Sequence, residues 1–280
     1  MTVESAAPRG RLALTFDNLG EASELERGTW PMDRPLGEHP SVTVALPRLL
    51  DELEAHGLTA TFFLEAINCE MYPDAVREIA ARGHEVGHHG WQHEAWAALD
   101  PRDERAALER GKRAFEELGV RVRGFRPPGG ELTASSQELL SEVGLEWCSP
   151  ATVPRVGAAG RGRLPFDWNE LRYLPFDWPA VDAYQLMPRF EDLRRERGDP
   201  PQPRSPREVL ELFCARVDAV SGDDAPEVLV LHPFLMLDPE WWECVPELLA
   251  RIAARVAAGD LEVAPGNDFA QPLRAPLSRF

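Results

Sequence analysis

Residues 83–93 read GHEVGHHGWQH and contain four of the seven histidines of the chain. His89 and His93 stand four positions apart, a spacing that on one turn of helix would bring both imidazoles to one face, where they could bind a single divalent cation. An isolated pair at this spacing is more often part of a solvated turn. The segments before and after the pair therefore decide between the two interpretations.

A zinc-protease pattern, H-E-x-x-H from His84 to His88, overlaps the same stretch, but its chemistry requires an unbroken helix. Gly83, Gly87 and Gly90 lie in or beside the pattern, and each disfavours a helix by about 1 kcal/mol relative to alanine. We therefore expect residues 85–89 to form a short strand that runs into a loop, and we set the protease interpretation aside.

The composition restricts the class of protein and its partners. The length of 280 residues suits one large α/β domain covering residues 1–280. A net charge of −17 would repel phosphate backbones and anionic membrane surfaces, which argues against nucleic acid as a partner. The four cysteines form no C-x-x-C pair, and no apolar window reaches the length of a membrane span. The first residues show no leader pattern, so we expect a cytoplasmic protein; the sequence leaves a homo-oligomer open.

Apolar runs alternate with helical periodicity along most of the chain. A short polar lead occupies residues 1–10, and an aperiodic stretch, interpreted as an irregular insert that lines a cleft, covers residues 149–204. That insert contains LPFDW twice, at residues 164–168 and 174–178. Strands are expected at 11–16, 58–64, 85–89, 120–125, 145–148, 228–231 and 261–263, and helices at 41–56, 73–81, 100–118, 135–143, 206–220 and 239–257.

This alternation predicts a parallel sheet with right-handed crossovers. Because no G-x-G-x-x-G turn is present, a barrel is favoured over an open nucleotide-binding sheet. In a parallel barrel the active site lies at the carboxyl ends of the strands. Polar clusters follow four of the expected strands, namely Asp17-Asn18, the histidine stretch, Arg126 and His232. We expect these clusters to meet on one rim.

Four motifs carry a family resemblance: TFDN at 15–18, HHGWQH at 88–93, RPPGG at 126–130 and LHPF at 231–234. Together they resemble the polysaccharide deacetylase superfamily (NodB homology, carbohydrate esterase family 4). The usual signatures there are TFDD, H-[ST]-x-x-H, R-x-P-[YF]-G and LH. The resemblance implies a distorted (β/α)7 barrel and a hydrolase of C–N amide bonds, in the first place an N-deacetylase of an N-acetylated sugar or sugar conjugate.

The resemblance also implies a metal site and an acid/base pair. Asn18, His89 and His93 would bind a divalent metal, Zn²⁺ in the first place, with Co²⁺ or Mn²⁺ as alternatives; such a metal activates water and polarises a carbonyl. Asp17 would be the base, held ionised by Arg126 through a bidentate contact, and His232 would be the acid. The amide N–H of Gly129 would stabilise the oxyanion, and Trp91 and Trp178 would contact substrate.

The chain also departs from the family pattern. Asn18 replaces a metal-binding aspartate, and a neutral amide oxygen should bind a cation less tightly than a carboxylate. Gly90, Gly129 and Pro233 also depart from the signatures, in the direction of the metal-independent, allantoinase-like hydrolases of ureides and cyclic imides, which would need no cofactor. A non-catalytic binding protein on the same barrel is a third hypothesis.

Overall fold

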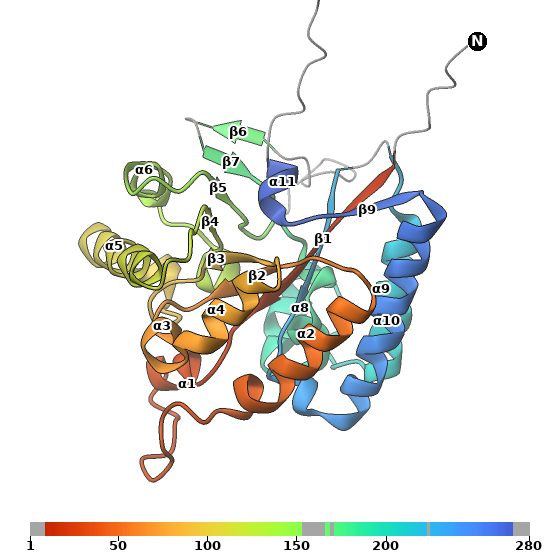
Figure 1. Cartoon of the computed structure of the whole chain (residues 1–280), viewed down its shortest axis with the longest axis horizontal. Coiled ribbons are helices and arrows are strands. Elements are labelled where there is room, and N and C mark those ends of the chain that lie inside the picture. The colour runs from red at the N-terminus through yellow and green to blue at the C-terminus, as the bar shows by residue number, and fades with distance from the viewer. Residues whose placement is uncertain (1–8, 153–165, 169–170, 223–224, 271–280) are drawn as a thin grey trace, which may run out of the picture.

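A single mixed sheet forms the centre of the computed structural model, which describes residues 9–152, 166–168, 171–222 and 225–270 (Figure 1). The sheet order is β6-β7-β5-β4-β3-β2-β1-β8, with β9 paired to β1. The strands are β1 (Gly10–Asp17), β2 (Thr61–Leu64), β3 (Glu85–His88), β4 (Gly124–Phe125), β5 (Trp147–Cys148), β6 (Phe166–Trp168), β7 (Leu171–Tyr173), β8 (Glu227–Leu231) and β9 (Leu261–Val263).

Helices connect the strands and cover the outside of the sheet (Figure 1). The α-helices are α1 (Ala22–Glu26), α2 (Leu46–Ala55), α3 (Asn68–Met71), α4 (Pro73–Ala81), α5 (Pro101–Glu117), α6 (Ser136–Glu142), α7 (Asp182–Leu186), α8 (Glu191–Arg197), α9 (Pro206–Ala219), α10 (Pro239–Ala258) and α11 (Gly266–Ala270). A π-helical turn, η1 (Ser41–Ala45), leads into α2, and the 3-10 turns among the described residues are η2 (Trp96–Ala98), η3 (Pro128–Gly130), η4 (Trp178–Ala180), η5 (Pro188–Phe190) and η6 (Leu235–Leu237).

Seven parallel strands, β1 to β5 with β7 and β8, curl into the distorted (β/α)7 barrel that the resemblance implied. The segment after β7 closes the curl on the side of β8. Phe176 pairs with Ala151 beyond the end of β5, and Val181 pairs with Val230 of β8. This closing segment contains the second LPFDW copy, so that part of the predicted insert belongs to the barrel wall.

The longest helices begin and end where local sequence signals place them. The Asp100 side chain caps α5 by accepting hydrogen bonds from the backbone N–H groups of Arg102 and Asp103 at 2.8 and 3.0 Å. The Asp238 side chain caps α10 in the same way, and Gly259 ends that helix with φ +83°. Glycine adopts this left-handed conformation without the steric cost that a β-carbon brings.

Alternating side chains divide each central strand between two apolar cores. Leu12 and Leu14 of β1 face the outer core beneath the helices, whereas Ala13 packs in the inner core with Phe63 and Val230. The same alternation directs Thr15 and Asp17 to the interior. The barrel interior is therefore apolar in its middle and polar at the carboxyl ends of its strands.

The expected helices and strands are present with shifts at their ends, and the strands expected at 120–125 and 145–148 are only two residues long. The HHGWQH segment runs from β3 into a loop, as the sequence predicted. His89 and His93 lie in a loop after β3 and not on a helix, because Gly90 and His93 adopt left-handed φ values of +78° and +68°. His88 is the last residue of β3, and His84 directly precedes this strand. The segment is therefore not the helix that the protease pattern requires.

Within residues 149–204 the structure has short elements where no periodicity was found. β7, α7 and α8 contain three, five and seven residues, which is too short for a hydrophobic period to show. The first LPFDW copy lies partly outside the described residues.

Candidate active site

The register of the sheet brings separate parts of the chain to one rim. Asp17 at the end of β1 pairs with Phe63 of β2, and Leu231 at the end of β8 pairs with Phe16. His88 of β3 pairs with both Leu64 of β2 and Phe125 of β4. The residues that follow these strand ends are Glu65, His89, Arg126 and His232, so they lie beside Asp17 at the carboxyl edge of the sheet.

Strand alternation also points these side chains into the barrel. Positions 61, 63 and 65 alternate with the outward Phe62 and Leu64, and in β8 the inward Val228 and Val230 are followed two residues later by His232. On β3 the outward residues are His84 and His88. The His84 ring contacts Phe62 at 5.4 Å, and the His88 ring lies between Phe115 and Phe125 at 5.8 and 5.7 Å. These two histidines are therefore core residues and not ligands.

Glu65, His89 and His93 form a cluster with the chemistry of a cation site. One ligand atom from each lies within 4.8 Å of the others. The imidazole Nδ1 of His89 is 2.8 Å from the carbonyl oxygen of Arg126. Donation from Nδ1–H to that carbonyl fixes the ring and leaves Nε2 free as a ligand. Two imidazoles and one carboxylate are a common ligand set for Zn²⁺ and similar ions.

The Glu65 side chain supports this assignment independently. It is completely buried, and its Oε1 has no hydrogen-bond partner among the described atoms. Its Oε2 accepts weak hydrogen bonds from the Leu19 backbone and the Asn68 side chain, both at 3.3 Å. Burial, with a smaller contribution from the charge of Asp17, raises the pKa of Glu65 to about 8. An unpaired oxygen on a buried carboxyl group is expected where a cation binds.

The two histidines are also suited to ligation because they are held neutral. Burial lowers the pKa of His89 to about 3, and burial together with the neighbouring His89 lowers the pKa of His93 to about 3. Their rings stand 5.1 Å apart in an edge-on arrangement. Neutral imidazoles at this separation offer lone pairs to a cation without first releasing protons.

Asn18 follows Asp17 in the left-handed conformation, with φ +61°, and its side chain is buried. The turn takes residue 18 out of the strand, and asparagine tolerates this conformation better than most residues. Asn18 remains a predicted ligand, while Glu65 places a buried carboxyl group at the neighbouring strand end.

Asp17 and Arg126 form a buried ion pair inside the barrel. The Arg126 Nη1 donates to the Asp17 Oδ1 at 2.7 Å and to the Thr15 hydroxyl at 2.8 Å, while its Nη2 donates to the Ser149 hydroxyl at 2.9 Å. The contact with Asp17 is therefore made by one nitrogen and is not the bidentate contact that we expected. The Phe63 ring lies 4.2 Å from the guanidinium carbon and fixes its plane.

His232 is held by a buried carboxylate. Its Nδ1 lies 2.5 Å from the Asp182 Oδ1, and its backbone N–H donates to the Asp182 Oδ2 at 2.8 Å. Asp182 is completely buried at the start of α7. With Nδ1–H directed at the carboxylate, Nε2 is the ring nitrogen that can exchange a proton with substrate.

The three predicted substrate-contacting residues differ in their surroundings. Gly129 is exposed with φ +75°, and a β-carbon there would meet no atom within 4 Å, so open space adjoins it. Trp91 is packed in the outer core, with the Arg110 guanidinium 3.3 Å from its ring centre. Trp178 is partly exposed and joins the rings of Phe176 and Phe190 at 5.5 and 5.6 Å.

Sequence reasoning overlooked two residues of this rim. Glu65 directly follows a strand that was predicted, so its position at the rim could have been inferred from the alternation of inward residues. Asp182 lies in the stretch without periodicity, and no sequence signal connects it to His232, 50 residues later.

The chain belongs to the polysaccharide deacetylase family, whose model matches residues 4–148. It is 32% identical over 97 residues to a peptidoglycan-N-acetylglucosamine deacetylase of Bacillus cereus, covering 34% of this chain and 35% of that protein. It is 29% identical over 144 residues to the deacetylase PgdA of Listeria monocytogenes, covering 51% of this chain and 26% of that protein. The chain thus matches about a third or less of these relatives' length.

Solved structures match over nearly the whole chain. A Mycobacterium smegmatis protein assigned to the polysaccharide deacetylases superposes with a TM-score of 0.77 at 28% identity, covering 99% of both chains. Puue allantoinase shares the fold, with a TM-score of 0.70 at 19% identity, covering 95% of this chain and 93% of that one. Within the described residues, no helix combines the length and apolar character needed to cross a bilayer.

Proposed function

We propose that this protein is a metal-dependent N-deacetylase that hydrolyses the amide of an N-acetylated amino sugar or its conjugate. One observation carries the proposal: the Glu65–His89–His93 cluster, the Asp17–Arg126 pair and the His232–Asp182 pair lie on the same rim. Amide hydrolysis needs an activated water, a polarised carbonyl and a proton for the leaving nitrogen. Each of the three groups suits one of these tasks.

The protein side chains divide the proton transfers between them. Asp17, held in position by Arg126, accepts the proton of the attacking water. His232, oriented by Asp182, donates a proton from Nε2 to the leaving nitrogen. The N–H of Gly129 adds a hydrogen-bond donor for the developing oxyanion, and the open space beside this glycine leaves room for the substrate carbonyl.

Glu65, His89 and His93 would hold the cation, with the amide oxygen of Asn18 as a further, weaker ligand. When bound, a divalent metal such as Zn²⁺ supplies Lewis-acid activation of water and of the acyl carbonyl. The buried carboxylate of Glu65 restores the charge that is missing at Asn18. The ligand set therefore remains two histidines and one carboxylate, but the carboxylate comes from the end of β2 instead of β1.

Elemental analysis and acetate release test the two parts of this proposal separately. Protein purified without added metal and then supplied with Zn²⁺, Co²⁺ or Mn²⁺ should bind about one equivalent and release acetate from N-acetylglucosamine oligomers. Glu65→Gln and His89→Gln should each weaken metal binding by about 10-fold or more. His84→Gln is the matched control, because His84 faces the outer core.

Unchanged metal binding in Glu65→Gln would remove Glu65 from the site. Asn18→Asp tests the remaining ligand: if the Asn18 oxygen contacts the metal, a carboxylate in its place should tighten binding. Full activity of the metal-free protein would contradict the metal-dependent mechanism.

A metal-independent hydrolase of ureides or cyclic imides is the second candidate. Asn18 is neutral, and without a cation the raised pKa of Glu65 keeps its carboxyl group protonated near neutral pH. A protonated carboxyl can donate a hydrogen bond to a substrate carbonyl. Ring opening of allantoin by metal-free protein would favour this candidate. A folded protein without turnover on either class of substrate would favour the non-catalytic binding protein.

A further inference from the structure

Two arginines at the rim have no acidic partner among the described residues. Arg189 lies in η5, and Arg27 follows the last residue of α1. Neither guanidinium forms an ion pair or a side-chain hydrogen bond within the described part of the chain, although this protein has 47 acidic residues against 30 basic ones.

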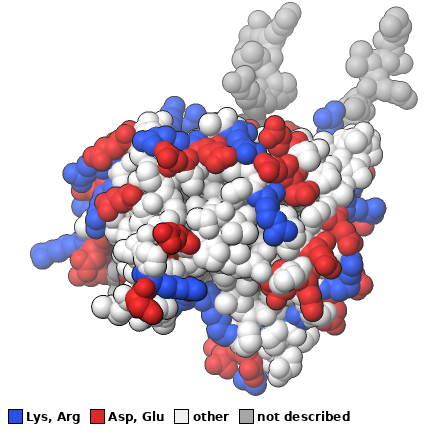
Figure 2. Space-filling view, turned by 60° about the horizontal axis from the view of Figure 1, so that its bottom comes forward, with Lys and Arg blue, Asp and Glu red and all other residues white. Residues whose placement is uncertain are grey.

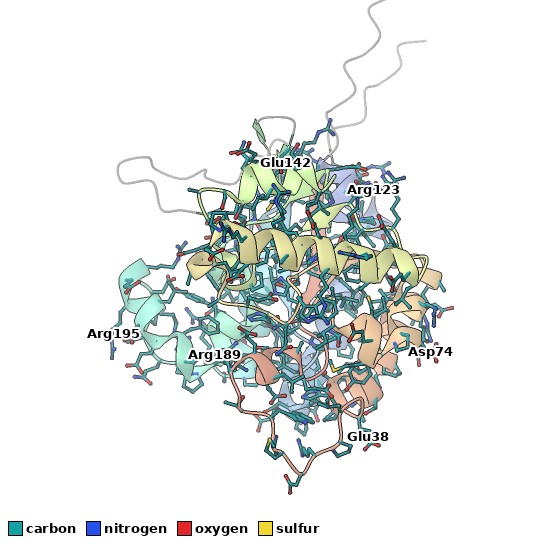
Figure 3. The ribbon with its side chains drawn as sticks, turned by 90° about the vertical axis from the view of Figure 1, so that its left-hand side faces the viewer. Glu38, Asp74, Arg123, Glu142, Arg189 and Arg195 are labelled. Carbon is teal, nitrogen blue, oxygen red and sulfur yellow. The ribbon has the colours of Figure 1, made fainter. Side chains whose placement is uncertain are left out.

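Arg189 and Arg27 lie near each other. Desolvation and then the charge of Arg27 lower the pKa of Arg189. Figure 3 shows Arg189 next to α1, whereas Arg195 of α8 points outward. Two like charges are thus held near each other.

An aromatic surface connects Arg189 with the reacting groups. The Phe176 ring is 5.0 Å from the guanidinium carbon of Arg126, which binds Asp17, and Trp178 and then Phe190 follow at ring distances of 5.5 and 5.6 Å. Arg189 directly precedes Phe190, and its guanidinium carbon lies 5.0 Å from the ring. Partly exposed rings such as Trp178 and Phe190 offer flat surfaces on which the apolar face of a sugar can pack.

Acidic side chains also occur at this rim, and Glu94 is one whose carboxylate is already engaged. Glu94 accepts hydrogen bonds from the backbone N–H groups of Trp91 and Gln92 at 3.0 and 3.1 Å, which stabilises the histidine loop. Figure 2 shows acidic and basic side chains around the edge of this face and a mostly uncharged middle.

We propose that the substrate carries an anionic group, a carboxylate or a phosphate, which Arg189 binds with the support of Arg27 while the sugar packs along Trp178 and Phe190. This inference rests on the proposed deacetylase function and narrows its substrate class to anionic N-acylated amino sugars. The guanidinium group forms charge-assisted hydrogen bonds with both kinds of anion. The anion would fix the distance between the charged end of the substrate and the amide that is cleaved.

Three probes separate the contribution of the anionic group from that of the sugar. They are N-acetylglucosamine, which is neutral, N-acetylmuramic acid, which carries a carboxylate, and N-acetylglucosamine 6-phosphate. For the metal-loaded protein, kcat/KM for at least one anionic probe should exceed that for the neutral probe by about 10-fold, mainly through a lower KM. The preference should shrink as salt rises from low to high concentration. The anionic probe with the higher kcat/KM shows whether the site prefers a carboxylate or a phosphate.

Arg189→Gln should reduce the ratio of anionic to neutral kcat/KM by about 10-fold, and Arg189→Lys should restore part of it. Arg27→Gln should act in the same direction by a smaller factor. Arg195→Gln is the matched control, because this arginine pairs with Glu191 and Asp192 on the outer side of α8 and should leave the ratio unchanged. A wild-type ratio near one, or a ratio that Arg189→Gln does not alter, would overturn the proposal.

If none of the probes releases acetate, the deacetylase function fails, and direct binding still decides the anion site. Isothermal calorimetry with the same three compounds should then show at least one anionic probe binding the wild type more tightly than Arg189→Gln by about 10-fold. Equal affinities of the two proteins for both anionic probes would reject the site.

Discussion

Arg126 is a buried cation whose charge depends on one carboxylate. Among the described residues, Asp17 is the only acid within ion-pair distance of its guanidinium. The remaining donors contact hydroxyl groups of Thr15 and Ser149. A charge in such surroundings is stable only while its partner stays ionised, because water cannot replace the lost interaction. Asp17 therefore has two roles, one in proton transfer and one in holding Arg126.

This double role leads to a prediction for Asp17→Asn. The change should lower turnover by about 10²-fold or more and should also cost about 3 kcal/mol of folding stability, since Arg126 keeps a buried charge without a counter-ion. Acetate release and denaturant unfolding measure the two effects.

A double variant separates these effects. Asp17→Asn combined with Arg126→Met removes both charges, and the Met side chain can pack against Phe63 and Phe176. Stability should largely return while activity stays absent. If Asp17→Asn alone keeps near-normal turnover, Asp17 is not the base.

Sequence reasoning located most of the individual rim residues, for physical reasons. Asp17, Arg126 and His232 each follow an apolar run directly, and in parallel sheets the strand ends meet at one edge. Asp182 could not be found in this way, since its position depends on how a segment without periodicity folds back against β8. Glu65 was within reach of the same reasoning, but the family pattern directed attention to residue 18.

At the scale of elements, α5 and β3 approach each other at one glycine. A β-carbon placed on Gly111 of α5 would lie 2.0 Å from Nε2 of His88, which is much closer than a real contact allows. The missing side chain thus lets the helix pack directly on the imidazole. Neither the helical pattern of residues 100–118 nor the strand pattern of residues 85–89 predicts this contact, because it joins two elements that sequence analysis treats separately.

Gly111→Ala should therefore destabilise the fold by about 1–3 kcal/mol, even though alanine favours a helix over glycine by about 1 kcal/mol. Arg113→Ala, at an exposed position of the same helix, should change stability by less than about 0.5 kcal/mol. Adding His88→Ala to Gly111→Ala should relieve part of the loss in a double-mutant cycle. Stabilisation by Gly111→Ala alone would show that the helix and the strand can separate without cost.

At the scale of the whole molecule, buried histidines link folding to pH. Burial, followed by the charge of Arg82, lowers the pKa of His84 to about 4, and His84 Nδ1 accepts a hydrogen bond from the backbone N–H of Ala60. In the unfolded chain a histidine titrates near pH 6.5. Because the folded-state pKa lies below this value, neutral His84 contributes to the free energy of unfolding. This contribution is fully present above about pH 6.5 and is lost as the pH falls toward 4.

The free energy of unfolding should consequently fall on acidification, with about 2 kcal/mol of the loss between pH 7.5 and 4.5 due to His84. His84→Gln keeps a hydrogen-bond acceptor for Ala60 but does not titrate, so the variant should lose correspondingly less stability over this range. Urea unfolding of both proteins at the two pH values measures the difference. Equal losses would show that the ring of His84 reaches solvent and is protonated in the folded state.

β1 has neighbours from distant parts of the chain. Thr15 pairs with Thr61 on one side and with Val230 on the other. During synthesis on the ribosome the first partner emerges early, whereas the second is missing until residues 227–231 have been translated. Until then the apolar run LALTF exposes unpaired backbone groups to which a strand of another nascent chain can add. Chains released early therefore carry an aggregation-prone edge, and a chaperone that covers it would protect the product.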